Sequence, residues 1–200
     1  MKFILATENP GKIKEMKEIL TSMDIDVVTR TEFGIDIEVE ETGTTFEENA
    51  LIKAKAICEA AGLPAIADDS GLCIDALGGA PGVYSSSFGG EGLNDKERCE
   101  YLLELLKNTE QRSAKFVSTI VCVFPDGRTV LARGECCGDI AIEPHGDNGF
   151  GYNPVFCANG NDITLAQLPA AEKNAISHRG KALREFSRLL TDISINTTGE

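Results

Sequence analysis

The chain has 200 residues, of which 42% are hydrophobic, so it can bury one good core arranged in one or two lobes. Its formal net charge of −13 disfavours a nucleic-acid polymer or an anionic membrane as the main partner, although a local basic cluster can still hold a small anion. Seven cysteines without a CxxC pair predict reduced, structural thiols in a cytosolic protein. The N-terminal apolar run is too short for a signal peptide, and we expect no membrane span.

The N-terminal segment predicts a strand, a polar turn and a helix. An apolar run covers residues 3–6, and apolar side chains recur at helical spacing over residues 13–20, with Glu15 among those expected to point mostly outside. The turn between them reads TENPGK and ends at Lys12. A turn of this kind is a common anion site, because the amides at a helix N-terminus attract negative charge. Simple helix capping is the alternative.

An acidic segment follows a second short strand, which is predicted at residues 26–28. Residues 35–41 alternate apolar and acidic side chains, a pattern typical of an exposed strand face, and Glu40 belongs to it. Two overlapping capping boxes at residues 44–48 predict the start of a long helix. Lys53 lies beside the apolar stripe of that helix, where it can reach a cleft or remain a surface lysine.

The central feature of the sequence is an acidic pair. Residues 63–67 form an apolar run that predicts a buried strand ending at Asp68 and Asp69. Because neighbours in a strand point to opposite faces, the two carboxylates cannot do the same work. A buried carboxylate needs a cation, a donor or a metal beside it. The pair is therefore a candidate metal or general-base site, with a solvated turn as the alternative.

The second half of the chain predicts a helix, a hairpin and a flexible loop. Asn94 and Glu97 form a capping box that opens the helix. Strands at residues 116–124 and 129–133 form the hairpin, so the sheet is at least partly antiparallel. A glycine-rich loop over residues 146–154 carries two aromatic side chains, which can stack on a base or pack on the core.

The last segment predicts an amphipathic helix with His178 and Arg179 at its start and Lys173 just upstream. Cations at this end of a helix oppose its dipole, which suggests that a ligand requires them. We expect a single domain over residues 1–200, with a frayed tail from about Asp192.

Several segments resemble the inosine/xanthosine triphosphate pyrophosphatase family in order and spacing: ATENPGK, ETGTTFEENALIKAKA, ADDSGLCIDALGGAPGVYSSSF, GFGYNPVF and EKNAISHRGKAL. The resemblance runs from Ala6 to about Leu183. It implies an α/β fold with an elongated mixed β-sheet flanked by helices, and two lobes with a nucleotide cleft between them. It also implies Mg²⁺-dependent hydrolysis of non-standard purine triphosphates, such as ITP, dITP and XTP, to the monophosphate and pyrophosphate. The resemblance further implies a homodimer in the cytoplasm that cleanses the nucleotide pool.

The same resemblance implies roles for individual residues. Asp69 resembles the family's residue that binds metal and activates water, and Glu40 resembles its metal-binding glutamate. The other matches are substrate contacts: the phosphate loop Thr7, Glu8, Asn9, Pro10, Gly11 and Lys12; the further phosphate contacts Lys53 and Lys173; the ligand contact Ser70; the base-binding loop Phe150, Gly151, Tyr152 and Asn153; and the base-reading pair His178 and Arg179.

The sequence departs from the family pattern at three places. Asn153 stands where Asp is usual, Gln167 where Glu is usual, and Ser85-Ser86-Ser87-Phe88 where Ser-Ala-Arg-Tyr is usual. An amide donates as well as accepts and carries no charge, so Asn153 bears on base preference more than on the chemistry. Two alternatives stay open: a related pyrophosphatase acting on modified pyrimidine or 7-methylated nucleotides, and a nucleotide-sensing binding module.

Overall fold

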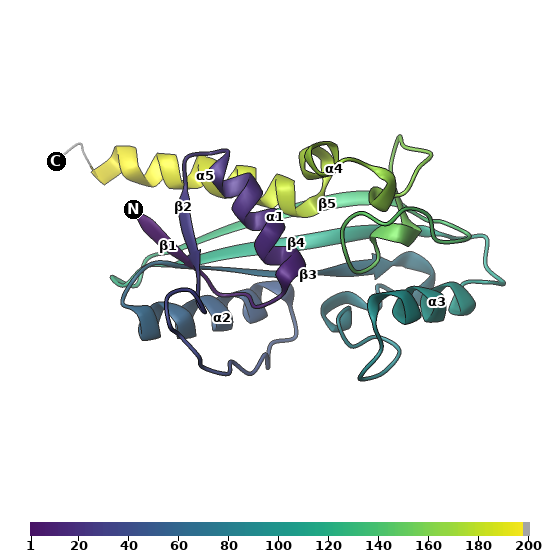
Figure 1. The fold of residues 1–200 in the computed structure, drawn as a ribbon, viewed down its shortest axis with the longest axis horizontal. Coiled ribbons are helices and arrows are strands. Elements are labelled where there is room, and N and C mark those ends of the chain that lie inside the picture. Colours follow the sequence, from purple (N-terminus) through teal and green to yellow (C-terminus); the bar gives the residue numbers. More distant parts are fainter. Residues whose placement is uncertain (198–200) are drawn as a thin grey trace. The chain divides into compact units, whose positions relative to one another are not determined.

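The computed structural model describes residues 1–197 as a mixed α/β fold, in which helices flank a six-stranded sheet of order β2-β1-β3-β4-β5-β6 (Figure 1). This architecture confirms the predicted fold class. The strands are β1 (Lys2–Leu5), β2 (Asp26–Thr29), β3 (Ala65–Ile74), β4 (Ser113–Val123), β5 (Thr129–Ile140) and β6 (Phe156–Ala158). The α-helices are α1 (Pro10–Thr21), α2 (Phe46–Ala61), α3 (Asp95–Leu105), α4 (Ala170–Ile176) and α5 (His178–Thr197).

The sheet is mixed because its two ends are built differently. β1 pairs in parallel with β2 and with β3, and helices α1 and α2 provide the crossovers that parallel neighbours need. β4 and β5 are neighbours joined by the short turn 124–128, which confirms the predicted hairpin. β6 then pairs with β5 in the antiparallel sense.

Local sequence signals set the helix ends. Asn9 caps α1 and Pro10 occupies its first turn, a position where the missing N–H of proline does no harm. Of the two overlapping capping boxes, Thr45 with Glu48 is the one that forms at the start of α2. Gly62 ends α2 with a φ of 63°, a left-handed conformation that glycine adopts without strain.

Two strand predictions are wrong. β3 does not end at Asp68 and Asp69 but continues through both to Ile74, with β4 as its neighbour in the sheet, whereas β1 pairs only with Ala65 and Ile66. Residues 35–41 form no strand in the described structure. Arg30 holds that segment instead, because its guanidinium donates to the carbonyl of Ile37 at 2.6 Å.

The chain divides into two compact units. The first comprises residues 1–69, 118–134 and the chain from Arg179 onward, and the second comprises residues 70–117 and 135–178.

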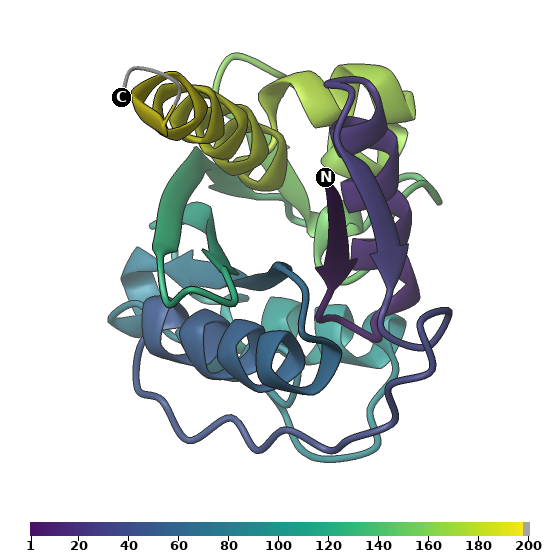
Figure 2. The same ribbon diagram turned by 90° about the vertical axis from the view of Figure 1, so that its left-hand side faces the viewer.

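Side-chain alternation along the strands builds the first unit as three layers. Phe3 and Leu5 face helices α1 and α5, whereas Ile4 and Ala6 face α2. β3 repeats the pattern, with Ile66 on the α1 and α5 side. Figures 1 and 2 show α2 on one side of these strands and α1 with α5 on the other. Asp68, two residues after Ile66, therefore lies on the same face of the sheet as Ile66, and Asp69 lies on the opposite face.

The second unit has a core of its own. Leu72 and Ile74 of β3 pack with Leu102 of α3, Phe116 of β4 and Phe156 of β6. Phe116 and Phe156 meet edge to face with ring centroids 4.8 Å apart.

Other expectations concern the thiols, the tail and membranes. All seven cysteines are free, and of these Cys137 is exposed. α5 extends as a helix to Thr197, and the remainder of the tail expected to fray, residues 198–200, lies outside the described residues. Within the described chain, none of the helices combines the length and the apolar character that crossing a bilayer requires.

Candidate active site

The turn after β1 is shaped by its own side chains. Thr7 Oγ1 accepts the amide N–H of Asn9 at 3.2 Å, and Asn9 Oδ1 accepts the amide N–H of Lys12 at 3.1 Å. Glu8 points outward and forms an ion pair with Arg30 at 2.8 Å. The capping alternative is thus confirmed for the backbone, and it leaves the side chain of Lys12 available for another task.

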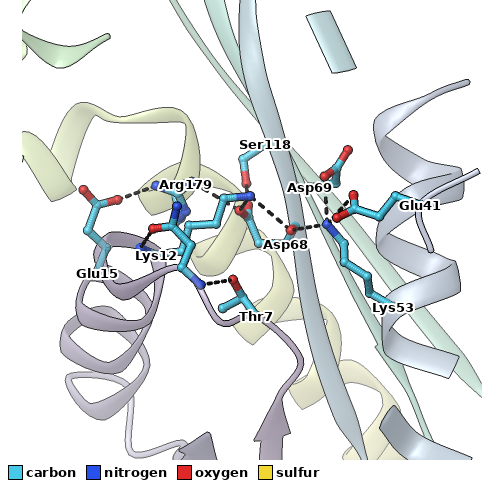
Figure 3. A network of polar contacts seen from close by, with 10 residues as sticks. Thr7, Lys12, Glu15, Glu41, Lys53, Asp68, Asp69, Ser118 and Arg179 are labelled. Atoms are coloured by element: carbon cyan, nitrogen blue, oxygen red, sulfur yellow. Dashed lines mark hydrogen bonds and ion pairs between the residues drawn. The ribbon is translucent and has the colours of Figure 1, made fainter. Parts of the chain in front are cut away.

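Lys12 reaches the first carboxylate of the acidic pair. Its Nζ lies 2.9 Å from Asp68 Oδ2 and also donates to the Asp68 carbonyl oxygen at 3.3 Å. Arg179 donates to the same Oδ2 at 3.2 Å, and Ser118 Oγ donates to Oδ1 at 2.5 Å (Figure 3). Asp68 is 1% exposed, so a fully buried carboxylate is held by two cations and a hydroxyl.

Glu15 is the second anion of this cluster. It lies on α1, and Arg179 Nη1 donates to its carboxylate. The prediction that Glu15 points outward is wrong, since the residue is only 6% exposed and pairs with an arginine that is 2% exposed. A buried guanidinium and a buried carboxylate stabilise each other, which neither could do alone.

Asp69 lies on the other face of β3 and has different partners. Lys53 of α2 donates to Asp69 Oδ1 at 2.8 Å and to Glu41 at 2.9 Å, and its Nζ also reaches the Asp68 carbonyl oxygen at 3.1 Å (Figure 3). Lys53 is therefore buried beside the acidic pair and is not a surface lysine, and its contact with phosphate stays a prediction. The carbonyl of Asp68 accepts from Lys12 and from Lys53, so the two faces are joined through one peptide group.

The two carboxylates differ in charge behaviour. Burial acts to raise the pKa of Asp68, but Arg179 and Lys12 outweigh it and hold that pKa well below its usual range. Burial raises the pKa of Asp69 to about 6, although Lys53 opposes the shift. Burial acts to lower the pKa of Lys53, but Asp69 and Glu41 outweigh it and raise that pKa. Asp69 thus shares its surroundings with a firmly charged lysine.

The Asp69 side of the strand has carboxylate oxygens that suit a divalent metal ion as ligands. Asp69 Oδ2 is buried and has no hydrogen-bond partner among the described residues. A buried anionic oxygen without a partner is unfavourable, and carboxylate oxygens are the ligands that Mg²⁺ prefers. Glu40 and Glu41 are both exposed, but Glu41 forms an ion pair with Lys53, the lysine that also pairs with Asp69. Glu40 stays a predicted ligand. In the described part of the chain, His, Cys, Asp and Glu side chains form no group of three or more that could hold a metal.

The second unit carries the glycine-rich loop and its neighbours. A Cβ built on Gly149, whose φ is +83°, would lie 2.1 Å from Asn153 Nδ2 and 3.1 Å from Lys173 Nζ, so these residues lie close together. The ring of His178 stacks on Phe116 with centroids 4.6 Å apart and planes 9° apart. Tyr152 packs in the core and donates to the Ser85 carbonyl at 2.9 Å, which confirms core packing for this aromatic.

The predicted site residues therefore fall into two groups. Lys12, Lys53, Asp69 and Arg179 belong to the first unit, together with Thr7, Asn9 and the turn that includes Pro10 and Gly11. Ser70, Lys173, His178 and the loop residues Phe150, Gly151 and Asn153 belong to the second. That both groups bind one nucleotide stays a prediction.

Comparison with known proteins identifies the family of the chain. The model of the Ham1 family matches residues 3–189. The chain belongs to the Ham1 family. Two relatives named dITP/XTP pyrophosphatase, from Bacillus subtilis and Haemophilus influenzae, are 49% and 50% identical to it, over 94% and 91% of this chain and 96% and 95% of their own lengths. The solved structure of a HAM1 protein from Coxiella burnetii has a TM-score of 0.86 at 44% identity and covers 96% of this chain and 99% of its own.

The departures of this Ham1 chain from the family pattern have structural roles. Gln167 accepts the amide of Thr164 at 2.9 Å in a capping box, a task that Gln and Glu both perform. Phe88, which stands where Tyr is usual, meets Tyr101 edge to face with ring centroids 5.5 Å apart and packs against the core of the second unit. Both changes are thus accommodated inside the second unit.

Sequence reasoning missed three residues of the first-unit cluster. Glu15, Glu41 and Ser118 each contact a predicted site residue, but none belongs to a predicted site. Glu41 follows Glu40, the glutamate that the resemblance assigns to metal binding, so the sequence prediction lay one position away. Ser118 sits in an apolar strand and had no signal beyond being a polar residue in that run.

Proposed function

We propose that this Ham1 protein hydrolyses non-standard purine nucleoside triphosphates, such as ITP, dITP and XTP, to the monophosphate and pyrophosphate, and so cleanses the nucleotide pool. As a nucleoside triphosphate pyrophosphatase it is a hydrolase acting on phosphorus anhydrides. The names and identities of its relatives support this reaction class. The observation that carries the proposal is Asp69, a buried carboxylate with one oxygen held by Lys53 and the other without a described partner.

The reaction we propose is attack of water on the α-phosphorus. The bond from the water oxygen to the α-phosphorus forms, and the bond from that phosphorus to the bridging oxygen of pyrophosphate breaks. Asp69 orients the water or accepts its proton, a role that its raised pKa suits near neutral pH. Lys53 holds Oδ1 and fixes the carboxylate.

The lysines act on the triphosphate. Lys12, Lys53 and Lys173 place ammonium groups that stabilise phosphate oxygens and the leaving pyrophosphate. Lys12 is bound to Asp68 in the structure, so binding of a triphosphate exchanges one anionic partner for another. Thr7 and Asn9 keep the turn in the shape that presents the N-terminal amides of α1.

We propose that the enzyme needs Mg²⁺, held by Asp69 and a glutamate of the Glu40–Glu41 pair. An ion bound there supplies positive charge against the phosphate oxygens. The proposal rests on the unpartnered Oδ2 and the neighbouring carboxylate. We also propose a cytoplasmic homodimer. Free thiols throughout the chain suit a reducing compartment, and light scattering at micromolar concentration tests the dimer.

Base choice rests on the second unit in this proposal. His178, fixed by its stack on Phe116, and the loop at residues 150–153 read the base. A base-reading role for Arg179 has to accommodate its ion pairs with Glu15 and Asp68, at least one of which must open for a base contact. The preference we expect is for 6-oxo purines without a 2-amino group. Arg has only donors, so it pairs with the 6-oxo group and not with the amine of adenine. Guanine also has the 6-oxo group, so exclusion of its 2-amino group has to come from the pocket wall near residues 150–153.

A substrate panel tests the function. ITP, XTP, GTP, ATP, dUTP and 7-methyl-GTP are offered to the enzyme with Mg²⁺ and with EDTA, and pyrophosphate release is measured. We expect ITP and XTP to be hydrolysed at a kcat/KM at least about a hundredfold above that of ATP, with no turnover in EDTA. Preference for dUTP or the methylated nucleotide supports the related-pyrophosphatase alternative, and binding of every nucleotide without turnover supports a sensing module. In ¹⁸O water, the label should enter the monophosphate.

A further inference from the structure

Ser118 bonds the buried carboxylate of Asp68 from the neighbouring strand. It lies on β4, next to β3 in the sheet, and its hydroxyl donates to Asp68 Oδ1 at 2.5 Å. Ser118 is 0% exposed and Asp68 is 1% exposed, so water does not compete for this bond. Figure 3 shows the hydroxyl pointing at Asp68 from the side opposite to the turn that carries Thr7.

The two carboxylate oxygens of Asp68 contact different partners. Oδ2 is shared by Lys12 at 2.9 Å and Arg179 at 3.2 Å, whereas Oδ1 accepts from the Ser118 hydroxyl. The terminal torsion of an aspartate is soft and roughly two-fold, so pairing at one oxygen leaves the carboxylate plane poorly fixed. A bond at the second oxygen fixes that plane and, with it, the direction in which Oδ2 presents itself to the two cations.

We propose that Ser118 is a positioning residue for the triphosphate: by fixing the Asp68 carboxylate it places the Lys12 ammonium where the phosphates bind. This inference rests on the proposed function, because it assigns Lys12 to the triphosphate. When Lys12 turns to the substrate, Asp68 keeps Arg179 and Ser118, and its carboxylate stays in place for the return of the lysine. Asp69 takes its contacts on the other face of β3, from Lys53, so activation of the water by Asp69 does not depend on Ser118.

The test compares three variants with the wild type. Ser118→Ala removes the donor, and Ser118→Cys keeps the volume but offers only a weak donor. Ser113→Ala is the matched control, because Ser113 lies on the same strand and also donates to an aspartate, Asp75, at 2.7 Å, in a more exposed setting. Steady-state kinetics with ITP give kcat and KM, and calorimetry gives the Kd of a non-hydrolysable ITP analogue and of inosine. Thermal melting reports the folded fraction at the assay temperature.

We expect Ser118→Ala to raise KM and the analogue's Kd about tenfold, with kcat within about threefold of wild type and inosine affinity unchanged, as loss of a bond to a charged group predicts. Ser118→Cys should give KM and Kd values between those of Ser118→Ala and the wild type. Ser113→Ala should match the wild type in both. Unchanged KM and Kd beside a lowered melting temperature would reduce Ser118 to a structural hydroxyl and overturn the proposal. A fall in kcat alone, or an equal loss of inosine affinity, would also overturn it. If the wild type neither hydrolyses ITP nor binds the analogue, the proposed function itself fails.

Discussion

The two faces of β3 treat adjacent carboxylates in opposite ways. Asp68 faces α1 and α5, where two cations and a hydroxyl satisfy it and hold its pKa low. Asp69 faces α2, where Lys53 takes one oxygen and burial raises the pKa to about 6. A satisfied buried charge is typical of a scaffold, whereas a buried charge with an unmet oxygen is typical of a site that awaits a ligand. Position within the strand, not residue type, separates the two tasks.

The largest expected effect tests the Asp69 face. Asp69→Asn keeps the shape but removes the base, so kcat for ITP should fall by about 10²–10⁴-fold. The melting temperature should not fall, because an ionised Asp69 with a raised pKa weakens the folded state at neutral pH. Kinetics and thermal melting on the same preparation check both halves. Near wild-type turnover would remove Asp69 from the chemistry.

Asp68→Asn should give the opposite balance. Removing this anion leaves the half-buried Lys12 and the buried Arg179 around an amide, and breaking a buried ion pair from one side typically costs about 3–5 kcal/mol. Urea denaturation should show a loss of this order. If the variant is as stable as Asp69→Asn, the two faces do not differ in how they stabilise their carboxylates.

Lysine substitutions sharpen the comparison at the substrate. Lys12→Ala should weaken binding of a non-hydrolysable ITP analogue by about 1.5–3 kcal/mol, the worth of a hydrogen bond to a charged group, and Lys173→Ala should do the same. Calorimetry with inosine serves as the control, because a nucleoside lacks phosphates. Equal affinity of variant and wild type for the analogue would make these lysines plain structural cations.

The smallest expected effect separates the neighbouring glutamates. Both glutamates are exposed, but Glu41 shares Lys53 with Asp69, so the geometry favours Glu41 as the second metal ligand. Glu41→Gln should raise the Mg²⁺ concentration for half-maximal activity several-fold, and Glu40→Gln should leave it close to that of wild type. The reverse order would restore the assignment that the resemblance implies.

The sequence could predict the structural features that depend on residues close together in the chain. The cap of α1, the box at Thr45 and Glu48 and the hairpin at residues 124–128 follow from neighbouring residues, and all are present. Strand alternation likewise predicted that Asp68 and Asp69 would face different partners.

What sequence missed depends on contacts between distant residues. Glu15 is buried because Arg179, 164 positions later in the chain, neutralises it. Ser118 matters because β4 lies beside β3, which brings its hydroxyl to a carboxylate 50 positions earlier. β3 continues through its acidic pair for the same reason, since the neighbouring strand β4 and cations on both faces stabilise it. A linear pattern shows none of these pairings.

The claim that the free oxygen of Asp69 receives the metal is tested most directly by counting bound ions. Mn²⁺ is titrated into the enzyme with a non-hydrolysable ITP analogue, and the free ion is followed by electron paramagnetic resonance. We predict that Asp69→Asn weakens Mn²⁺ binding at least about tenfold relative to wild type, as loss of a ligand carboxylate does. Ser113→Ala should bind the ion as the wild type does. Equal Mn²⁺ affinity of Asp69→Asn and wild type would contradict the account.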